Sequence, residues 1–255
     1  MEVRTVNGPL FQSIQIHLVV MHKIIVLNAK GGSGKTTIST NLAACYAARG
    51  RFPALLDYDP QGSALNWLRT RSADMPRIHG VEAHKKNMAV TRSWQMRMPK
   101  EVDRVIIDTP ASIGGADLAD YVRQADTIIV PVLPSPIDIH TVTSFIKEIL
   151  VLGKLRTGPN ARRLGVVANR VKENTRVYNT LQSFLASLNL PFITAFRDSQ
   201  YYIHAFVEGI GIHELRDVRI QSLTQQWQPL LDWIDDDIDT PSVVSDERSL
   251  DLVLD

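Results

Sequence analysis

The sequence is poor in cysteine and in long hydrophobic runs. Cys45 is the single cysteine among 255 residues, which excludes an internal disulfide and a four-cysteine metal cluster. Because Cys45 lies in an apolar, helix-like stretch, we expect a small core residue there. No run of 18 apolar residues is present, so no membrane-spanning helix is expected. Residues 1–20 make a poor signal peptide, and the composition suits a reducing cytoplasm.

The charge is nearly balanced but unevenly distributed. The formal net charge is +1, yet the segment from Asp232 to Asp255 carries nine acidic residues and one basic residue. The chain that precedes this segment therefore has a net charge of +9. The near-neutral total therefore conceals a basic body and an acidic tail, and the tail would be repelled by anionic lipid.

Apolar strand-like segments alternate with helix-like segments. Strands are predicted over residues 23–28, 52–59, 103–110, 126–134, 161–171 and 191–196. Helices are predicted over residues 35–50, 63–71, 117–125, 138–156, 177–189 and 221–236. Because the strands are continuously apolar, we expect a doubly wound, mostly parallel α/β sheet with helices on both faces. Pro131 indicates that its strand lies at an edge or that the strand ends there.

One domain, residues 21–238, accounts for this alternation. Residues 239–255 are acidic and lack periodicity, so we expect a mobile tail. Residues 1–20 form an N-terminal extension with two alternatives. Either Met21 is the natural start, or the extension is a poorly ordered arm.

A glycine-rich turn between the first strand and the first helix predicts a phosphate-binding loop. The segment "AKGGSGKTT" departs from G-x-x-x-x-G-K-[ST] only at its first position, Ala29. Glycines let successive amides face an anion, and the following helix start is positive. We expect Lys35 at the β- and γ-phosphates and the Thr36 hydroxyl at Mg²⁺. The predicted phosphate contacts are Gly31, Gly32, Ser33, Gly34, Lys35, Thr36 and Thr37.

Three acidic residues follow predicted strands. Asp108 ends the apolar run "VIID" and is expected to bind Mg²⁺; the alternative is a helix cap or turn residue. Asp57 and Asp59 are one residue apart, so an extended strand would point both to the same side. Beside a triphosphate they can order Mg²⁺ waters or position an attacking water. The alternative is that one of them caps the helix from Ser63.

The combination of "KGGSGKT", "DYDPQGS" and "DTP" resembles the ParA/MinD family of deviant-Walker ATPases, and "DPQG" is most similar to its ParA branch. The resemblance covers residues 21 to about 233. It implies ATP and Mg²⁺ as cofactors and a homodimer in the ATP-bound state. Lys30 matches the family's signature lysine, which reaches the partner's phosphates and stabilises phosphoryl charge. The alternative for Lys30 is a solvated loop lysine.

The same resemblance implies further roles. Asp59 would orient the attacking water, which makes Lys30, Lys35 and Asp59 the catalytic residues. Asp57 would support Mg²⁺ through a water. Asn169, at the end of a predicted strand, matches the adenine-reading position; the alternative is a turn asparagine.

The resemblance also implies that the ATP-bound dimer binds double-stranded DNA without sequence preference, so we expect nucleoid association. Such binding depends on phosphate contacts, and the basic body is compatible with it. The predicted DNA contacts are Arg162, Arg163 and Arg197, each with a plain solvated surface as the alternative. Phe196 and His204 replace a proline and an acid of the family pattern, which weakens the transfer of nucleotide contacts there. Residues 1–20 are too few for a helix-turn-helix domain.

Several related functions fit less well. A MinD-like membrane role requires a basic amphipathic C-terminus, an iron–sulfur carrier requires cysteine pairs, and a tyrosine kinase relative requires a tyrosine cluster. A dethiobiotin-synthetase-like ATP-dependent ligase shares the fold but generally lacks the signature lysine together with "DPQG". The expected partner is a ParB-like or cargo-adaptor protein that stimulates hydrolysis. The cargo is either a plasmid or chromosome locus or a protein assembly such as a carboxysome.

Overall fold

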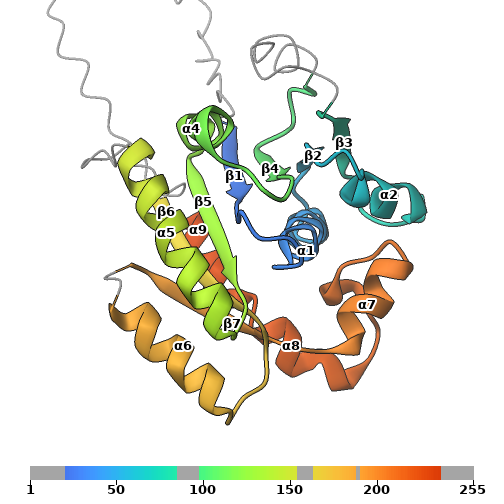
Figure 1. Ribbon diagram of the computed structural model, residues 1–255. Coiled ribbons are helices and arrows are strands. Elements are labelled where there is room, and N and C mark those ends of the chain that lie inside the picture. Colours follow the sequence, from blue (N-terminus) through green and yellow to red (C-terminus); the bar gives the residue numbers. More distant parts are fainter. Residues whose placement is uncertain (1–20, 85–97, 154–162, 188–189, 237–255) are drawn as a thin grey trace, which may run out of the picture.

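A single seven-stranded sheet organises the computed structural model, which describes residues 21–84, 98–153, 163–187 and 190–236. Within these ranges the strand order is β3-β2-β4-β1-β5-β6-β7, and every strand pair is parallel (Figure 1). The strands are β1 (His22–Val26), β2 (Ala54–Asp57), β3 (His79–Glu82), β4 (Arg104–Asp108), β5 (Thr127–Val132), β6 (Arg163–Val171) and β7 (Phe192–Arg197). The predicted parallel α/β sheet is confirmed.

Within the described ranges, helices connect the successive strands other than β3 and β4, between which residues 85–97 are not described, and helices cover both faces of the sheet (Figure 1). They are α1 (Lys35–Ala48), α2 (Ser63–Thr70), α4 (Gly115–Gln124), α5 (Pro136–Gly153), α6 (Arg176–Ser187), α7 (Gln200–Val207), α8 (Gln221–Gln225) and α9 (Gln228–Asp235). Two 3₁₀ turns, η2 (Ile212–Glu214) and η3 (Val218–Ile220), lie between α7 and α8. Across the described ranges, none of the helices has both the length and the apolar character needed to cross a membrane.

Alternate strand residues supply two hydrophobic layers, as the pleat of a strand requires. Ile25 and Leu27 of the first strand segment pack with α4, α5 and α6 on one face. Ile24 and Val26 pack with α1, α2, α8 and α9 on the other. All four are fully buried, and each such side chain contributes about 2 kcal/mol of transfer free energy. Burial on both faces explains why the strands lack a polar alternation.

Helix α1 follows the phosphate loop and ends close to residue 50, the predicted end of this helix. Its last residue is Ala48. Gly50 follows in the left-handed region of the backbone, a conformation that glycine adopts without strain. The Gly50 amide donates to the Ala47 carbonyl at 3.0 Å and so closes the last turn.

Strand β3 and helix α7 were not predicted from the sequence. Strand β3 is short and half-exposed, and Val81 is its one strongly apolar residue, so no apolar run marks it. Helix α7 follows β7 directly and is capped by Ser199, whose hydroxyl accepts a hydrogen bond from the Tyr201 amide.

The predicted single helix over residues 221–236 is wrong, because Pro229 cannot continue the preceding turn and the chain restarts as α9.

Pro131 occupies an interior strand, so its predicted edge position is wrong. Strand β5 lies between β1 and β6. Pairing of β5 with β1 ends at Ile129, so the missing amide of Pro131 faces a place where β1 has already ended. The Pro131 carbonyl accepts a hydrogen bond from the Asn28 side chain at 2.6 Å instead. The alternative, a position near the strand end, is confirmed.

Candidate functional site

The predicted phosphate loop joins β1 to α1 at the carboxyl edge of the sheet. Gly32 and Gly34 have φ angles of +75° and +94°, which only glycine adopts readily. A Cβ atom at Gly34 would lie 1.9 Å from the Asn169 side-chain nitrogen. Gly34 also precedes the first residue of α1, whose amides provide a positive helix end. The loop can therefore hold an anion such as a phosphate group.

Lys35 lies inside the loop. Its ammonium donates to the Lys30 carbonyl at 3.3 Å, and the residue is only 6% exposed. Burial lowers the pKa of Lys35, while Asp108 and Asp59 oppose that shift, as expected for a cation taken out of water beside carboxylates. A buried ammonium with two nearby carboxylates is placed to meet further negative charge from phosphates.

Lys30 is held differently from Lys35. Its ammonium lies 2.5 Å from a carboxylate oxygen of Asp138, in the first turn of α5. Its backbone amide donates to the Asn28 side chain at 2.8 Å, which fixes the loop at this residue. The Lys30 side chain is 36% exposed and the Asp138 side chain 7%. The alternative of a merely solvated lysine is wrong for this structure. No motif in the sequence marks Asp138, which is the first residue of the predicted helix over residues 138–156.

Oxygen atoms suited to binding Mg²⁺ lie close together at the end of β4. The Thr36 hydroxyl donates to one oxygen of Asp108 at 2.7 Å, and the Ser39 hydroxyl donates to the other at 3.1 Å. Asp108 is fully buried, and burial raises its pKa to about 7. A buried carboxylate beside a threonine hydroxyl at a phosphate loop fits Mg²⁺.

Other Mg²⁺ ligands would come from phosphate and water. The described residues contain no cluster of three or more His, Cys, Asp or Glu that could hold a metal alone. Mg²⁺ characteristically takes one or two carboxylates and completes its shell with waters and substrate phosphates. Asp57 lies opposite Asp108 in the β2–β4 register.

The Asp57 carboxylate caps the first turn of α2, whereas Asp59 lines a cavity. The Asp57 carboxylate accepts hydrogen bonds from the amides of Asp59 and Leu65, both at 3.0 Å. The alternative that one acid caps the helix from Ser63 is thus correct for Asp57, and its metal role stays a prediction. The expectation of one extended strand through both acids is wrong, because β2 ends at Asp57 and the chain turns. Asp59 is partly buried at the edge of the cavity.

The cavity has a volume of about 570 Å³ and two chemically different halves. One half is the phosphate loop with Asp59. The other is formed by the ends of β6 and β7 together with α7. The residues of this second half are Asn169, Arg170, Arg197, Asp198, Ser199, Tyr202, Ile203, Phe206 and Val207. Sequence reasoning predicted no helix over α7 and weakened the transfer of nucleotide contacts to this segment, because Phe196 and His204 depart from the family pattern.

Asn169 connects the two halves. Its side-chain nitrogen donates to the Ser33 carbonyl at 2.9 Å, and its oxygen accepts from the Arg170 amide at 3.0 Å. The residue is 6% exposed and lies on the cavity wall. Its position at the end of β6 was predicted correctly. Its side chain supports the phosphate loop, and adenine reading stays a prediction.

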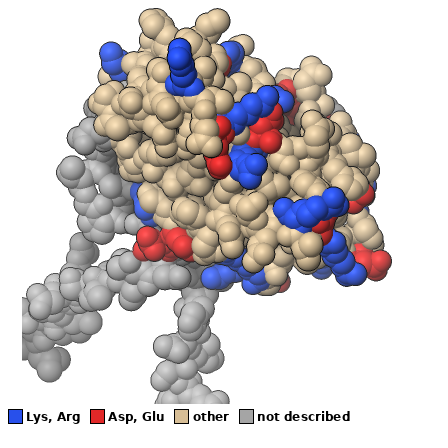
Figure 2. Space-filling view, turned by 90° about the horizontal axis from the view of Figure 1, so that it is seen from below, with Lys and Arg blue, Asp and Glu red and all other residues tan. Residues whose placement is uncertain are grey.

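The predicted DNA contacts do not lie together. Arg162 is outside the described residues. Arg163 begins β6, where its guanidinium lies 4.3 Å from the centre of the Trp233 ring. Arg197 ends β7 and lines the cavity. Because β6 and β7 are parallel, Arg163 and Arg197 lie at opposite ends of the sheet. Figure 2 shows the lower face with basic groups scattered beside acidic ones, not as one continuous patch.

Comparison with known proteins identifies the nucleotide-binding part of the chain. Residues 24–207 match the family described as "CobQ/CobB/MinD/ParA nucleotide binding domain". Over 197 residues the chain is 30% identical to "Maintenance of carboxysome distribution protein A" of Halothiobacillus neapolitanus. That alignment covers 75% of this chain and 87% of the relative.

Solved structures share the fold. The ATP complex of a McdA variant from Cyanothece has a TM-score of 0.65 at 16% identity, covering 86% of this chain and 96% of that one. The septum site-determining protein MinD of Pyrococcus horikoshii, complexed with Mg-ADP, has a TM-score of 0.61 at 16% identity. That match covers 85% of this chain and 96% of the MinD chain.

Proposed function

Because the chain belongs to the CobQ/CobB/MinD/ParA nucleotide-binding family and is one of its Mg²⁺-dependent ATPases, we propose that it positions a cargo by cycling through an ATP-bound homodimer. The observation that carries this proposal is the different placement of two lysines on one loop. Lys35 lies inside the loop, where it serves its own site. Lys30 lies at the rim, paired with Asp138 and still 36% exposed. A rim lysine is available to a second subunit that packs over the cavity.

Binding of ATP would rely on the phosphate loop, the end of β4 and the cavity beside them. The amides of the phosphate loop and the ammonium of Lys35 neutralise phosphate charge. Thr36 and Asp108 would hold Mg²⁺, which when bound neutralises charge on the phosphate oxygens. We assign the nucleoside to the α7 side of the cavity, because the aromatic and aliphatic side chains there, Tyr202, Ile203, Phe206 and Val207, suit a purine better than a phosphate.

Hydrolysis requires a positioned water and compensation of developing charge. Asp59 is the acid in the phosphate-loop half of the cavity, and its carboxylate can accept a hydrogen bond from the attacking water. Lys30 of one subunit supplies charge to the phosphates of the other, as an arginine finger does. To do so, its ammonium must leave Asp138. Hydrolysis is thereby coupled to dimerisation.

The dimer's partners follow from charge and from the family. We propose non-specific binding of the ATP-bound dimer to double-stranded DNA, and hence nucleoid association, through the basic body of the chain. A ParB-like or cargo-adaptor protein then stimulates hydrolysis and resets the dimer. A relative named for carboxysome distribution favours a protein assembly over a DNA locus as the cargo.

The test is binding to random-sequence duplex DNA with ATP, with ADP and without nucleotide, across a salt series. We expect binding only with ATP, tighter in Asp59→Ala, and falling steeply with salt because phosphate contacts release counterions. Arg163→Ala and Arg197→Ala, measured separately, decide which end of the sheet contacts DNA. Equal binding with ATP and ADP, or none in any condition, would contradict the proposal.

A further inference from the structure

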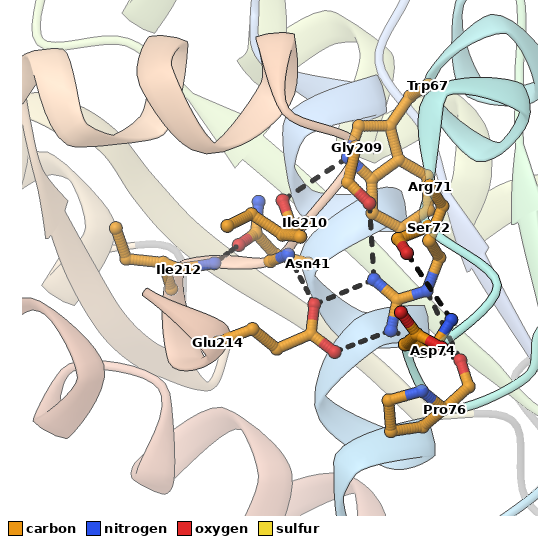
Figure 3. Close-up of polar contacts among 11 residues, drawn as sticks. Asn41, Trp67, Arg71, Ser72, Asp74, Pro76, Gly209, Ile210, Ile212 and Glu214 are labelled. Carbon is orange, nitrogen blue, oxygen red and sulfur yellow. Dashed lines mark hydrogen bonds and ion pairs between the residues drawn. The ribbon is translucent and has the colours of Figure 1, made fainter. Parts of the chain in front are cut away.

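A buried ion pair lies outside the cavity and is not used by the chemistry described above. The Arg71 guanidinium donates to both oxygens of Glu214, at 2.7 and 2.5 Å (Figure 3). The two side chains are 4% and 5% exposed. Glu214 also accepts a hydrogen bond from the Gly211 amide at 2.7 Å. We call this pair the Arg71–Glu214 clasp.

The clasp joins α2 to the segment that follows α7. Arg71, directly after α2, also donates to the carbonyl of Gly209 at 3.2 Å, just beyond the end of α7. The Trp67 indole of α2 donates to the Ile210 carbonyl at 3.3 Å. Figure 3 shows these groups converging from α2 on the same turn. The chain approaches so closely that a Cβ at Gly209 would lie 2.5 Å from the Arg71 amide nitrogen.

The turn held by the clasp is also tied to the phosphate-loop helix. The Ile212 amide donates to the Asn41 side chain of α1 at 2.7 Å, and Asn41 donates back along α1 to the Thr37 carbonyl at 2.8 Å. A Cβ at Gly211 would lie 2.5 Å from the Ala44 methyl group. The end of α7 is therefore fixed relative to both α1 and α2.

Helix α7 is held at both ends and along its length, where the Tyr201 hydroxyl donates to Asp217 at 3.2 Å and the Tyr202 hydroxyl accepts from the Trp227 indole at 3.0 Å. Its first turn follows β7 and is capped by Ser199. Its last turn depends on the clasp, and that turn carries Phe206 and Val207, two residues of the cavity wall. Val207 is 67% exposed and Ile203 is 54% exposed, so packing alone holds the outer side of α7 weakly. The directional contacts of Arg71 to Gly209 and Glu214 fix the turn that follows this end of α7.

We propose that the Arg71–Glu214 clasp positions α7 as the nucleoside-binding wall of the cavity, and so sets the affinity for the nucleoside part of ATP. The proposal rests on the assignment of this cavity to ATP. Buried ion pairs add little net stability compared with apolar packing, but they impose a defined geometry. The planar fork of arginine matches a carboxylate at two points, which the point charge of lysine does not. Arg71 is a positioning residue, since it acts through α7.

The test compares a ligand that spans both halves of the cavity with one that reaches only the phosphate loop. Affinities for Mg-ADP and for inorganic tripolyphosphate are measured for wild type, Arg71→Lys and Trp67→Phe, with melting curves to verify folding. Arg71→Lys should weaken ADP binding by about tenfold, equivalent to the loss of one well-placed contact. Tripolyphosphate binding should stay within about twofold of wild type, because no clasp residue contacts the loop. In ATP hydrolysis, KM should rise while kcat is preserved.

Arg51→Lys is the matched control. It makes the same change in the Arg51–Asp103 ion pair, whose arginine is 50% exposed and which lies between the end of α1 and the start of β4, and it should leave ADP affinity unchanged. Trp67→Phe removes the indole hydrogen bond to Ile210 and keeps an aromatic ring beside the Arg71 guanidinium. It should show the same split to a smaller extent, so the proposal can still be tested if Arg71→Lys does not fold. Equal weakening of both ligands, no weakening of ADP, or a fall in kcat alone would overturn the proposal. These binding measurements need no dimer and no DNA, so failure of the positioning function would be recognised separately.

Discussion

The Lys30 ammonium lies 2.5 Å from a carboxylate oxygen of Asp138. This contact joins the phosphate loop to the first turn of α5, although the two are far apart in the sequence. Asp138 is 6% exposed, so its charge is poorly solvated and its attraction for Lys30 is stronger than that of a surface pair. A lysine held in this way is not yet positioned at the phosphates of another subunit.

Replacing Asp138 should make closure of the dimer easier. In Asp138→Asn, Lys30 loses its charged partner within the subunit while the size of the side chain is kept. We expect the ATP concentration that gives half-maximal dimerisation to fall by about three- to tenfold, the range for loss of roughly 1 kcal/mol of competing interaction. The measurement is light scattering during an ATP titration.

The control for this prediction is Glu148→Gln, which removes one charge from the same helix at an exposed position. Dimerisation should be unchanged in the control. A wild-type ATP dependence in Asp138→Asn would show that the contact does not compete with the dimer.

The two lysines of the loop should fail in different ways. Lys35→Ala removes the ammonium inside the loop and should abolish detectable ATP binding. Lys30→Ala removes a group at the rim, so ATP binding should stay within about threefold of wild type while hydrolysis falls by at least about a hundredfold. Equilibrium binding of a fluorescent nucleotide and release of phosphate separate the two effects. A wild-type hydrolysis rate in Lys30→Ala would show that Lys30 does not act on the phosphates of the other subunit.

The loop itself was predictable from sequence because its chemistry is local. Glycines at two left-handed positions, a lysine and a threonine at a helix start all lie within a few residues of one another. Asp108 was predictable too, since it follows a buried strand. Neither Asp138 nor the Arg71–Glu214 pair could be found in this way. Each has its partner in a distant part of the sequence, and only the packing of α5, α2 and α7 brings the partners together.

Gly34 provides a steric test of the loop. Gly34→Ala places a Cβ 1.9 Å from the Asn169 side-chain nitrogen and forces a non-glycine residue to φ +94°. ADP affinity should fall by at least about a hundredfold, because Asn169 then loses its place beside the loop. Gly50→Ala is the matched control, since Gly50 has φ +79° with nothing within 4 Å of the added Cβ. The control should cost about 1 kcal/mol in stability and keep wild-type affinity.

His213 makes stability depend on pH. Burial, followed by the charge of Arg49, lowers its pKa from 6.5 to about 4, and neither ring nitrogen has a hydrogen-bond partner in the described part of the chain. The unfolded chain binds a proton below pH 6.5, whereas the folded chain does so only near pH 4. The free energy of unfolding therefore falls as the pH drops from about 6.5 to 4.

Substituting His213 by phenylalanine should remove that dependence while it keeps an aromatic ring against Trp227, whose centre lies 5.6 Å away. In urea titrations between pH 7 and 4, His213→Phe should lose about 2–3 kcal/mol less stability than wild type. An identical pH profile for both proteins would show that this imidazole takes up its proton at an ordinary pKa in the folded state.

The apolar character of α7 shows another limit of sequence reasoning. Tyr202 and Phe206 resemble core residues, and both pack partly against the hydrophobic layer of α1, α8 and α9. That they also line the cavity follows from the register of β7 and from the turn at Gly209. No periodicity in the sequence encodes either of these.

The most direct measurement of the central claim is the mass of the protein in solution by sedimentation, with ATP, with ADP and without nucleotide. Wild type, Lys30→Ala and Asp59→Ala are compared. The account predicts a monomer near 28.5 kDa with ADP, a transient dimer with ATP, and a lasting dimer for Asp59→Ala with ATP. Lys30→Ala should remain monomeric although it binds ATP. An Asp59→Ala protein that stays monomeric at saturating ATP would contradict the account.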